Sequence, residues 1–495
     1  MSLRLKLSSH GSILLLGVFG LGMLIRGLPE LLSGAYPVGY DLLAGYAPAM
    51  LTLPETYPLV LFGWQTSPLA IFILWFFWIV SHIDLFLFLK ITGPIFYGLL
   101  TASFYYMLTK GLRWDRKKSL ITALLLLLQP AVLRNGWDQL RLMLGFVFLF
   151  LLLAETEFDI VSAAQKKPFT VGVLSFLIIL SQQLAAVVFF VVVLWQFVKS
   201  DWGKSSGKAL LVVLPAVMVF GLQVYFSFLS GSHFSAHFTP IQLPTGSGIF
   251  AFTNYFLSDP RFINGDHFSI LAYVGNLSLY VVVPLIFFVV KGFFKDRVFF
   301  PMISWLLFAS YSIVIFPWFA LSFYWFWMFL LPIPMTVYAV HGLEKWGVLG
   351  DRRHRRKLAA GMLVLFVIGF GYASSLISVG YPLAYSYMPP GLVKSCVDFE
   401  DIPDIQKAFD WANLNLPINA TVVVPEKFQG FSVMILREDL LIRVAPALLK
   451  FNEVIHLTEN WSFFAIYYTE EVGNNGQSIS QLVKFGSIGV FKTRT

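Results

Sequence analysis

The sequence predicts an α-helical polytopic membrane protein, with about 11 spans plus an interfacial helix, that ends in a small external α/β domain. Charged residues make up only 13% of the 495 residues, whereas soluble domains carry about 25%. Apolar residues make up 57% and recur in long runs. The basic residues lie in blocks between these runs. These observations exclude a single soluble globule, a disordered chain and a soluble nucleic-acid binder, although the net charge is +8.

The apolar runs predict eleven spans, because a bilayer core of about 30 Å requires roughly 20 residues of helix. The predicted spans begin near residues 12, 91, 119, 139, 168, 184, 209, 269, 299, 319 and 358. No small-residue cleavage motif follows the first run, which is therefore interpreted as a retained span rather than a signal peptide. The single cysteine, Cys396, excludes an intramolecular disulfide framework and any Cys-rich metal site.

The basic blocks predict the orientation of the spans in the cell membrane. They precede the first span and follow the second, fourth, sixth, eighth and tenth, so the positive-inside rule predicts a cytoplasmic N-terminus and an external tail. This alternation requires that Leu69–Ile83 does not cross the bilayer. Its Trp and Phe residues favour an interfacial helix along the outer leaflet. The alternative is a twelfth span with an external N-terminus.

Two domains are predicted. Residues 1–380 form the transmembrane module, with external loops at about 30–90 and 230–268, and residues 381–495 form the external α/β domain. In that domain Asp401–Leu414 has the spacing of a helix, and three β-branched or aromatic runs predict strands. These runs are Thr421–Pro425, Ser462–Tyr468 and Ile488–Lys492.

Polar residues at the external ends of the spans are the candidates for chemistry, because the common motifs of nucleotide-binding enzymes, metalloproteases and serine hydrolases are absent from the sequence. Asp41 stands in the segment Pro37-Val-Gly-Tyr-Asp41, beyond the first span. A carboxylate in a partly apolar cleft close to the membrane can take a proton from a hydroxyl group. The alternative is a simple turn residue, because Gly39 favours a bend.

A second polar segment, Arg134-Asn-Gly-Trp-Asp138-Gln-Leu-Arg141, joins the third and fourth predicted spans on the same side. Asp138 and Arg141 are three residues apart and would share a face if both lay on one helix. Polar groups so close to lipid are costly and usually functional, and a guanidinium group suits phosphate recognition. The alternative is a structural ion pair at a helix end, with arginine extending toward lipid headgroups.

Two further sets of residues are candidates. The loop at 230–268 carries His233, His237 and Arg261, but a metal site needs a third ligand and supporting hydrogen bonds, so a plain extracellular loop is the alternative. Lys90, where the interfacial stretch meets the second span, is placed to meet a lipid phosphate. It would equally suit an ordinary lysine that extends to the interface.

The arrangement of these segments resembles the GT-C superfamily of membrane glycosyltransferases, in particular archaeal-type members. In that superfamily an external loop with an Asp follows the first span, an interfacial helix comes next, and a second acidic loop joins the third and fourth spans. An external C-terminal domain is common. The residues that carry the likeness are Pro37–Asp41, Lys90-Ile-Thr-Gly-Pro94, Trp137–Arg141, Ala408–Asn413 and Ala420–Glu426.

The resemblance implies inverting transfer of a sugar from a polyprenyl-phosphate donor to a protein, lipid or glycan acceptor at the external face. It implies that Asp41 is the base that deprotonates the acceptor hydroxyl group. Asp138 would match the second acidic position, where it orients the base, an arginine or a divalent metal. Arg141, Arg134 or Lys90 would stabilise the phosphate of the leaving lipid.

The sequence departs from the superfamily in the tenth span. Residues Ser322–Trp327 are mostly aromatic where related enzymes often carry an arginine, and the absence of D-x-D and W-W-D-like motifs argues against an oligosaccharyltransferase.

Two other function classes remain. A transporter or flippase for a lipid or polar solute would show inverted repeats and broken helices. A non-catalytic scaffold would bind a partner through its outer domain.

Overall fold

The computed structural model describes the transmembrane and C-terminal parts of the chain with several gaps. The described residues are 9–32, most of 37–53, 68–199, 204–230, most of 274–315, 324–349, parts of 353–361, most of 401–445, 463–472 and 479–493. Four predictions lie outside them: the loop at 230–268 with its candidate residues, the starts of the spans near 269 and 319, most of the span from 358, and the domain boundary after residue 380.

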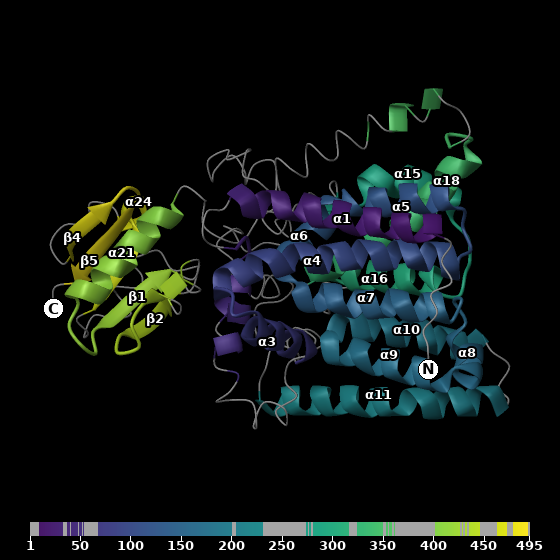
Figure 1. The fold of residues 1–495 in the computed structure, drawn as a ribbon, viewed down its shortest axis with the longest axis horizontal. Coiled ribbons are helices and arrows are strands. Elements are labelled where there is room, and N and C mark those ends of the chain that lie inside the picture. Colours follow the sequence, from purple (N-terminus) through teal and green to yellow (C-terminus); the bar gives the residue numbers. More distant parts are fainter. Residues whose placement is uncertain are drawn as a thin grey trace.

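The N-terminal part is a helical bundle, and Figure 1 shows most of its helices running side by side. Its first helices are α1 (Ser9–Leu32), the π-helical turn η1 (Leu42–Tyr46), α3 (Leu69–Ser81), α4 (Leu85–Tyr106), the π-helical turn η2 (Met107–Gly111), α5 (Arg116–Leu127) and α6 (Pro130–Asp138). The next are α7 (Leu140–Glu155), α8 (Ile160–Lys166), α9 (Pro168–Ser181), α10 (Gln183–Lys199) and α11 (Lys204–Ser230). The last described helices are α15 (Val283–Gly292), α16 (Phe299–Ile315), α17 (Tyr324–Met328) and α18 (Pro332–Lys345).

The lengths of these helices support a multi-pass membrane protein. Four described helical stretches are long and apolar enough to cross a bilayer: Gly11–Leu31, Leu85–Gly111, Gly207–Tyr225 and Phe326–Lys345. The pair α5 and α6 is a fifth candidate, bent by 63° at a short break. Pro130 is the first residue of α6, where its missing N–H leaves no helical hydrogen bond unmade. The other apolar helices have 10–17 residues, so the number of eleven spans stays a prediction.

The stretch predicted to lie at the interface forms α3, which has 13 residues. At 1.5 Å per residue this helix is about 20 Å long, shorter than a bilayer core of about 30 Å. It ends at His82, which has a left-handed φ of 54°. The Asp84 carboxylate then accepts the N–H of Leu87 at 3.0 Å and starts α4. The helix packs on α7 and α9, and its placement along the outer leaflet stays a prediction.

Ion pairs gather several of the basic blocks at one end of the bundle. The pairs are Lys110–Glu155, Lys167–Glu155, Arg113–Glu157, Lys118–Glu344 and Arg297–Asp159. All of these pairs except Lys167–Glu155 join separate connections, so the blocks that follow the second, fourth, eighth and tenth predicted spans share a side, as the predicted alternation requires. Which side of the bilayer this is stays a prediction.

Two glycines allow α15 and α18 to pack closely. A Cβ atom on Gly292 would overlap the Tyr338 carbonyl oxygen, and one on Gly342 would overlap the Phe288 carbonyl oxygen. Backbones come this close only where neither helix carries a side chain, as is common between helices in membranes.

The C-terminal part is an α/β domain. Its elements are α21 (Ile402–Asn415), β1 (Thr421–Pro425), β2 (Leu441–Ala445), β3 (Phe464–Tyr468), α24 (Thr469–Val472), β4 (Ile479–Phe485) and β5 (Ile488–Thr493). The sheet has the order β2-β1-β3-β5-β4, in which β1 is parallel to β2 and β3, and β5 is antiparallel to β3 and β4. The predicted helix and three predicted strands are therefore confirmed, whereas β2 and β4 were not predicted.

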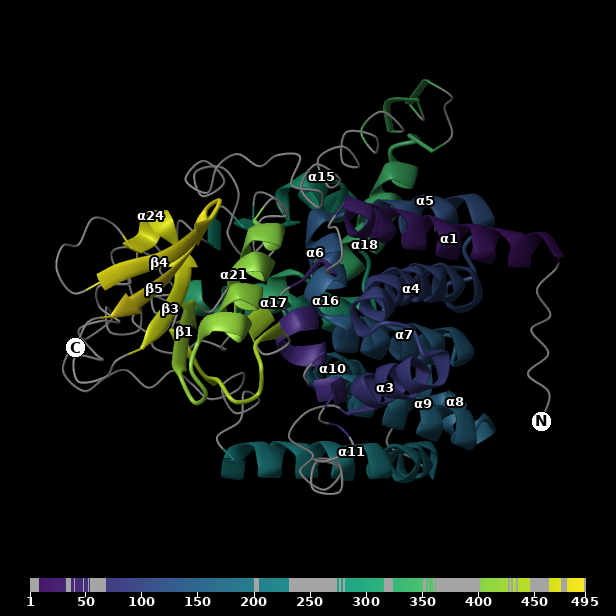
Figure 2. The same ribbon diagram turned by 60° about the vertical axis from the view of Figure 1, so that its left-hand side comes forward.

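The apolar core of this domain reaches into the bundle. Residues of α21 at helical spacing pack on Val422, Val424 and Val490 of the sheet. Leu43 of η1 belongs to the same cluster and is only 2% exposed. Phe86, at the start of α4, packs against it. Figures 1 and 2 show the domain beside the end of the bundle at which α1 ends and α4 begins.

Candidate functional site

The segment before Asp41 is a buried bend at the end of α1. Val38 is fully buried, and Gly39 has a φ of 132°, a conformation that residues with a Cβ atom rarely adopt. The turn expected from the sequence is therefore present. Asp41 follows it, half-buried, and directly precedes η1. The bend turns the chain back over the bundle.

Asp41 contacts the junction between α6 and α7. The side-chain amide of Gln139 donates a hydrogen bond from Nε2 to Asp41 Oδ2 at 3.0 Å. The backbone N–H of Arg141 donates to the Tyr46 hydroxyl at 3.1 Å, and the Arg141 guanidinium carbon lies 5.6 Å from the centroid of the Tyr46 ring. The two polar segments found in the sequence thus meet directly, far apart as they are in the chain.

Asp138 and Arg141 do not lie on one helix, so the condition for a shared helical face is not met. Asp138 is the last residue of α6, and Arg141 lies in α7, because the helix breaks at Gln139 (φ −106°, ψ 52°). The backbone N–H of Gln139 still closes α6 on the Asn135 carbonyl at 2.8 Å, while its side chain turns to Asp41. The side chain of Asp138 lies outside the described residues.

The other predicted cations lie around the same end of the bundle. The Arg134 guanidinium carbon is 5.9 Å from the centroid of the Trp137 ring, so it stacks within α6. Lys90, half-buried in α4, interacts electrostatically with Glu30 and Arg26 of α1. Lys90 is therefore near α1, and Arg141 is near η1.

A buried ion pair that the sequence analysis did not single out connects these parts. Arg26 is fully buried, and its Nη1 lies 2.6 Å from Glu30 Oε1. Its Nε donates to the Gly136 carbonyl at 2.8 Å and its Nη2 to the Val38 carbonyl at 3.1 Å. The other Glu30 oxygen accepts the N–H of Val38 at 2.9 Å. A signal for this pair does exist in the sequence: opposite charges four residues apart within an apolar span.

Tyr46 is protonated at neutral pH. Burial raises the pKa of its phenol above the ordinary value of 10.0, although the nearby Arg141 guanidinium opposes this. The neutral hydroxyl can accept the Arg141 N–H and keep its own proton. Chemically, the arrangement offers a half-buried carboxylate with one oxygen held by an amide, and a guanidinium that lies against the ring of Tyr46 in the same loop. A carboxylate can accept a proton, and a guanidinium can stabilise an anionic group.

The described residues contain no group of three His, Cys, Asp or Glu side chains that could hold a metal ion. His233, His237 and Arg261 lie outside the residues that the structure describes, so the loop site stays a prediction.

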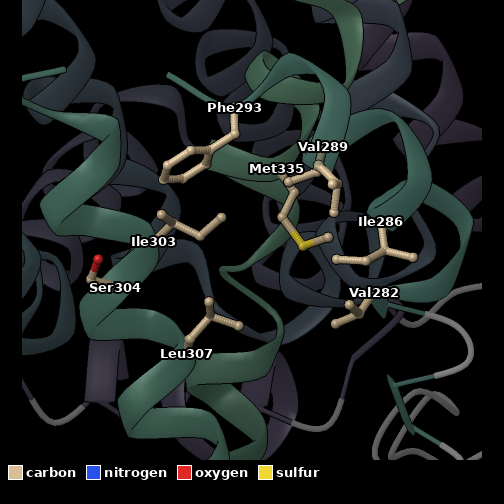
Figure 3. Close-up of a pocket in the computed structure, with 9 residues that line it drawn as sticks. Val282, Ile286, Val289, Phe293, Ile303, Ser304, Leu307 and Met335 are labelled. Carbon is tan, nitrogen blue, oxygen red and sulfur yellow. The ribbon is translucent and has the colours of Figure 1, made fainter. Parts of the chain in front are cut away.

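A cavity of about 370 Å³ lies between α15, α16 and α18 (Figure 3). Its lining is apolar, as at Ile286, Ile303 and Met335, apart from Ser304, so it offers no ionisable group for chemistry.

No protein-family model matches this sequence, and no curated protein matches it. Two solved structures are similar to it. ArnT from Cupriavidus metallidurans, in the apo state, aligns with 98% of this chain and 98% of its own, with a TM-score of 0.51 and 13% identity. The arabinofuranosyltransferase AftD from Mycobacteria aligns with 99% of this chain, with a TM-score of 0.51 and 9% identity, and this chain spans 40% of its length. The chain therefore shares its fold with ArnT and AftD.

Proposed function

We propose that this protein is a GT-C-type glycosyltransferase. In this proposal it moves a sugar from a polyprenyl-phosphate donor to an acceptor at the external membrane face, with inversion at the anomeric carbon. Asp41 is the base. The lipid phosphate is bound by Arg141, Arg134 and Lys90. Asp138 is the second acidic residue. The acceptor is a hydroxyl group of a protein, lipid or glycan.

The contact between Asp41 and Gln139 carries the proposal. It joins the loop after α1 to the α6–α7 junction, where the Arg141 guanidinium lies against the ring of Tyr46 from the same loop. The fold shared with ArnT and AftD adds support, since AftD is by its name an arabinofuranosyltransferase. A buried apolar surrounding, as at Val38 and Tyr46, strengthens the interactions of charges with each other.

The chemistry can be written for these residues alone. Asp41 accepts the proton of the acceptor hydroxyl, whose oxygen attacks the anomeric carbon from the side opposite the phosphate. The bond from that carbon to the phosphate oxygen breaks, and the polyprenyl phosphate leaves with one more negative charge. A guanidinium or ammonium group stabilises that charge as it develops. No step is assigned to a metal.

The test is transfer of radiolabelled sugar from a polyprenyl-phosphate donor by the purified full-length protein. We expect Asp41→Asn to lose at least about 100-fold in turnover, the order of magnitude that general-base catalysis contributes. The matched control is Asp84→Asn, because Asp84 caps α4 with an exposed carboxylate and asparagine caps a helix equally well. Full activity of Asp41→Asn would show that the assigned base is wrong.

Two other experiments, one on the purified protein and one in cells, distinguish the remaining function classes. Uptake of a lipid or solute into proteoliposomes without any covalent product would support a transporter or flippase instead. An unchanged cellular glycan profile after replacement of both Asp41 and Asp138 would support a scaffold.

A further inference from the structure

The Arg26 guanidinium connects the segment before Asp41 to the segment before Gln139. It donates to the carbonyl of Val38, three residues before Asp41, and to the carbonyl of Gly136, three residues before Gln139. Its third nitrogen meets the carboxylate of Glu30. All three guanidinium nitrogens are thus engaged by protein groups, and the side chain is 0% exposed. Arg26 is therefore too deeply buried to contact a substrate.

The packing around Arg26 leaves it little room to move. A Cβ atom on Gly93 would lie 3.2 Å from Nη2, and one on Gly136 would lie 2.9 Å from the ring of Tyr97. The Tyr97 hydroxyl in turn donates to the Leu127 carbonyl at 2.7 Å, which fixes the ring next to the end of α5. The guanidinium is held in one place, and so are the carbonyls that it binds.

We propose that Arg26 is a positioning residue that sets the distance between Asp41 and the α6–α7 junction; the catalytic part of this inference rests on the proposed function. A planar guanidinium presents donors in fixed directions to three acceptors, which a lysine ammonium cannot do. Glu30 pairs with the buried charge of Arg26 and accepts the N–H of Val38. Together with the bond from Arg26 to the Val38 carbonyl, this holds both backbone polar groups of Val38. A displacement of about 1 Å in such a site can cost about 100-fold in rate.

The first test compares Arg26→Lys with Glu155→Gln in the transfer assay, with kcat expressed per folded protein. Glu155 forms a partly buried ion pair with Lys110 at the opposite end of the bundle, which makes it a matched control. We expect Arg26→Lys to lower kcat at least about tenfold and to leave KM for the lipid donor within about twofold, because the residue positions and does not bind. Glu155→Gln should keep its kcat even where its melting temperature falls.

The second test needs no substrate. In a Cys396→Ser background, cysteines at Asp41 and Gln139 are joined by a short thiol cross-linker, since the two native side chains meet at 3.0 Å. We expect Arg26→Lys to lower the cross-linking yield severalfold, and Glu30→Gln to lower it less, because glutamine still accepts the N–H of Val38. Glu30→Gln also serves where Arg26→Lys fails to fold.

The outcomes separate the two proposals. One outcome is a wild-type protein that shows no transferase activity while its cross-linking yield still depends on Arg26. That result would overturn the proposed glycosyltransferase function and support the positioning role of Arg26. An unchanged cross-link together with unchanged kcat in Arg26→Lys or Glu30→Gln would overturn the positioning role and leave the glycosyltransferase standing. A fall in melting temperature with unchanged kcat per folded protein would also overturn it, because that result describes a purely structural ion pair.

Discussion

Tyr46 belongs to the same loop as Asp41, and its side chain contacts Arg141 at the start of α7. Its hydroxyl accepts the backbone N–H of Arg141, and its ring faces the guanidinium of the same residue. Because the phenol is buried, its proton stays in place at neutral pH, and the ring holds Arg141 near the Asp41 loop without adding a charge. The ring thus fixes where the cation stands relative to the carboxylate.

We expect Tyr46→Phe to lower both stability and turnover. The partly buried N–H of Arg141 loses its acceptor, which costs about 1 kcal/mol, and Arg141 gains freedom to move. The measurements are thermal unfolding in detergent and sugar transfer by the folded fraction. Tyr225→Phe is the control, because Tyr225 is 58% exposed on α11. Equal effects of both variants would contradict the role given to Tyr46.

At the scale of elements, the connection from α15 to α16 depends on one carboxylate. Asp296 Oδ1 accepts the N–H groups of Val298 and Phe299, and Oδ2 accepts the hydroxyl of Tyr338 at 2.8 Å. Asp296 thus caps α16 and attaches it to α18. Burial raises the pKa of Asp296 above its ordinary value of 3.8, against the effect of these hydrogen bonds.

The raised pKa predicts a pH dependence. The folded chain binds the Asp296 proton more tightly than the unfolded chain, so this contribution to stability is complete below pH 3.8 and is lost as the pH rises through the folded pKa. The amide introduced by Asp296→Asn does not titrate. We therefore expect the melting temperature of the variant, relative to wild type, to increase from pH 4 toward pH 8 in detergent. A difference that is constant with pH would contradict this.

At the same scale, the sequence predicted some elements better than others. The long apolar runs indicated α1, α4 and α11, because a helix that crosses a bilayer needs about 20 consecutive, mostly apolar residues. Strand β4 was missed because an edge strand such as Ile479–Phe485 alternates polar and apolar residues only weakly. The boundary at Gln139 was predicted, because the fourth span was placed near residue 139. The hydrogen bond from its side chain to Asp41 was not predicted, because Asp41 lies 98 residues away.

At the scale of the whole molecule, the same limit applies to the candidate site. Charge and spacing indicated Asp41 and the polar segment around Arg141 as residues of interest, but the sequence could not indicate what holds them. Arg26 contacts Gly136 across 110 residues, and Leu43 joins a core formed by residues beyond 400. Such partners are set by three-dimensional packing, which no local pattern records.

Leu43 connects the core of the C-terminal domain to the Asp41 loop, and we expect Leu43→Ala to destabilise both. Removing a buried leucine side chain costs about 2–5 kcal/mol, here divided between the domain core and its contact with η1. Amide hydrogen exchange should become faster in residues 41–47, and sugar transfer should fall. Leu51→Ala is the control, because Leu51 is 47% exposed in the same loop. Unchanged exchange in 41–47 would show that the domain does not support the loop.

The shared core of Leu43 and the sheet also has a consequence for biosynthesis. Leu43 leaves the ribosome before strand β5, which carries Val490 and lies more than 400 residues further along the chain. At about 5–20 residues per second, the nascent Asp41 loop waits on the order of half a minute for its partner. A chain that stops before β5 lacks part of the core that buries Leu43, so the loop that carries Asp41 gains its full support only after β5 has been made.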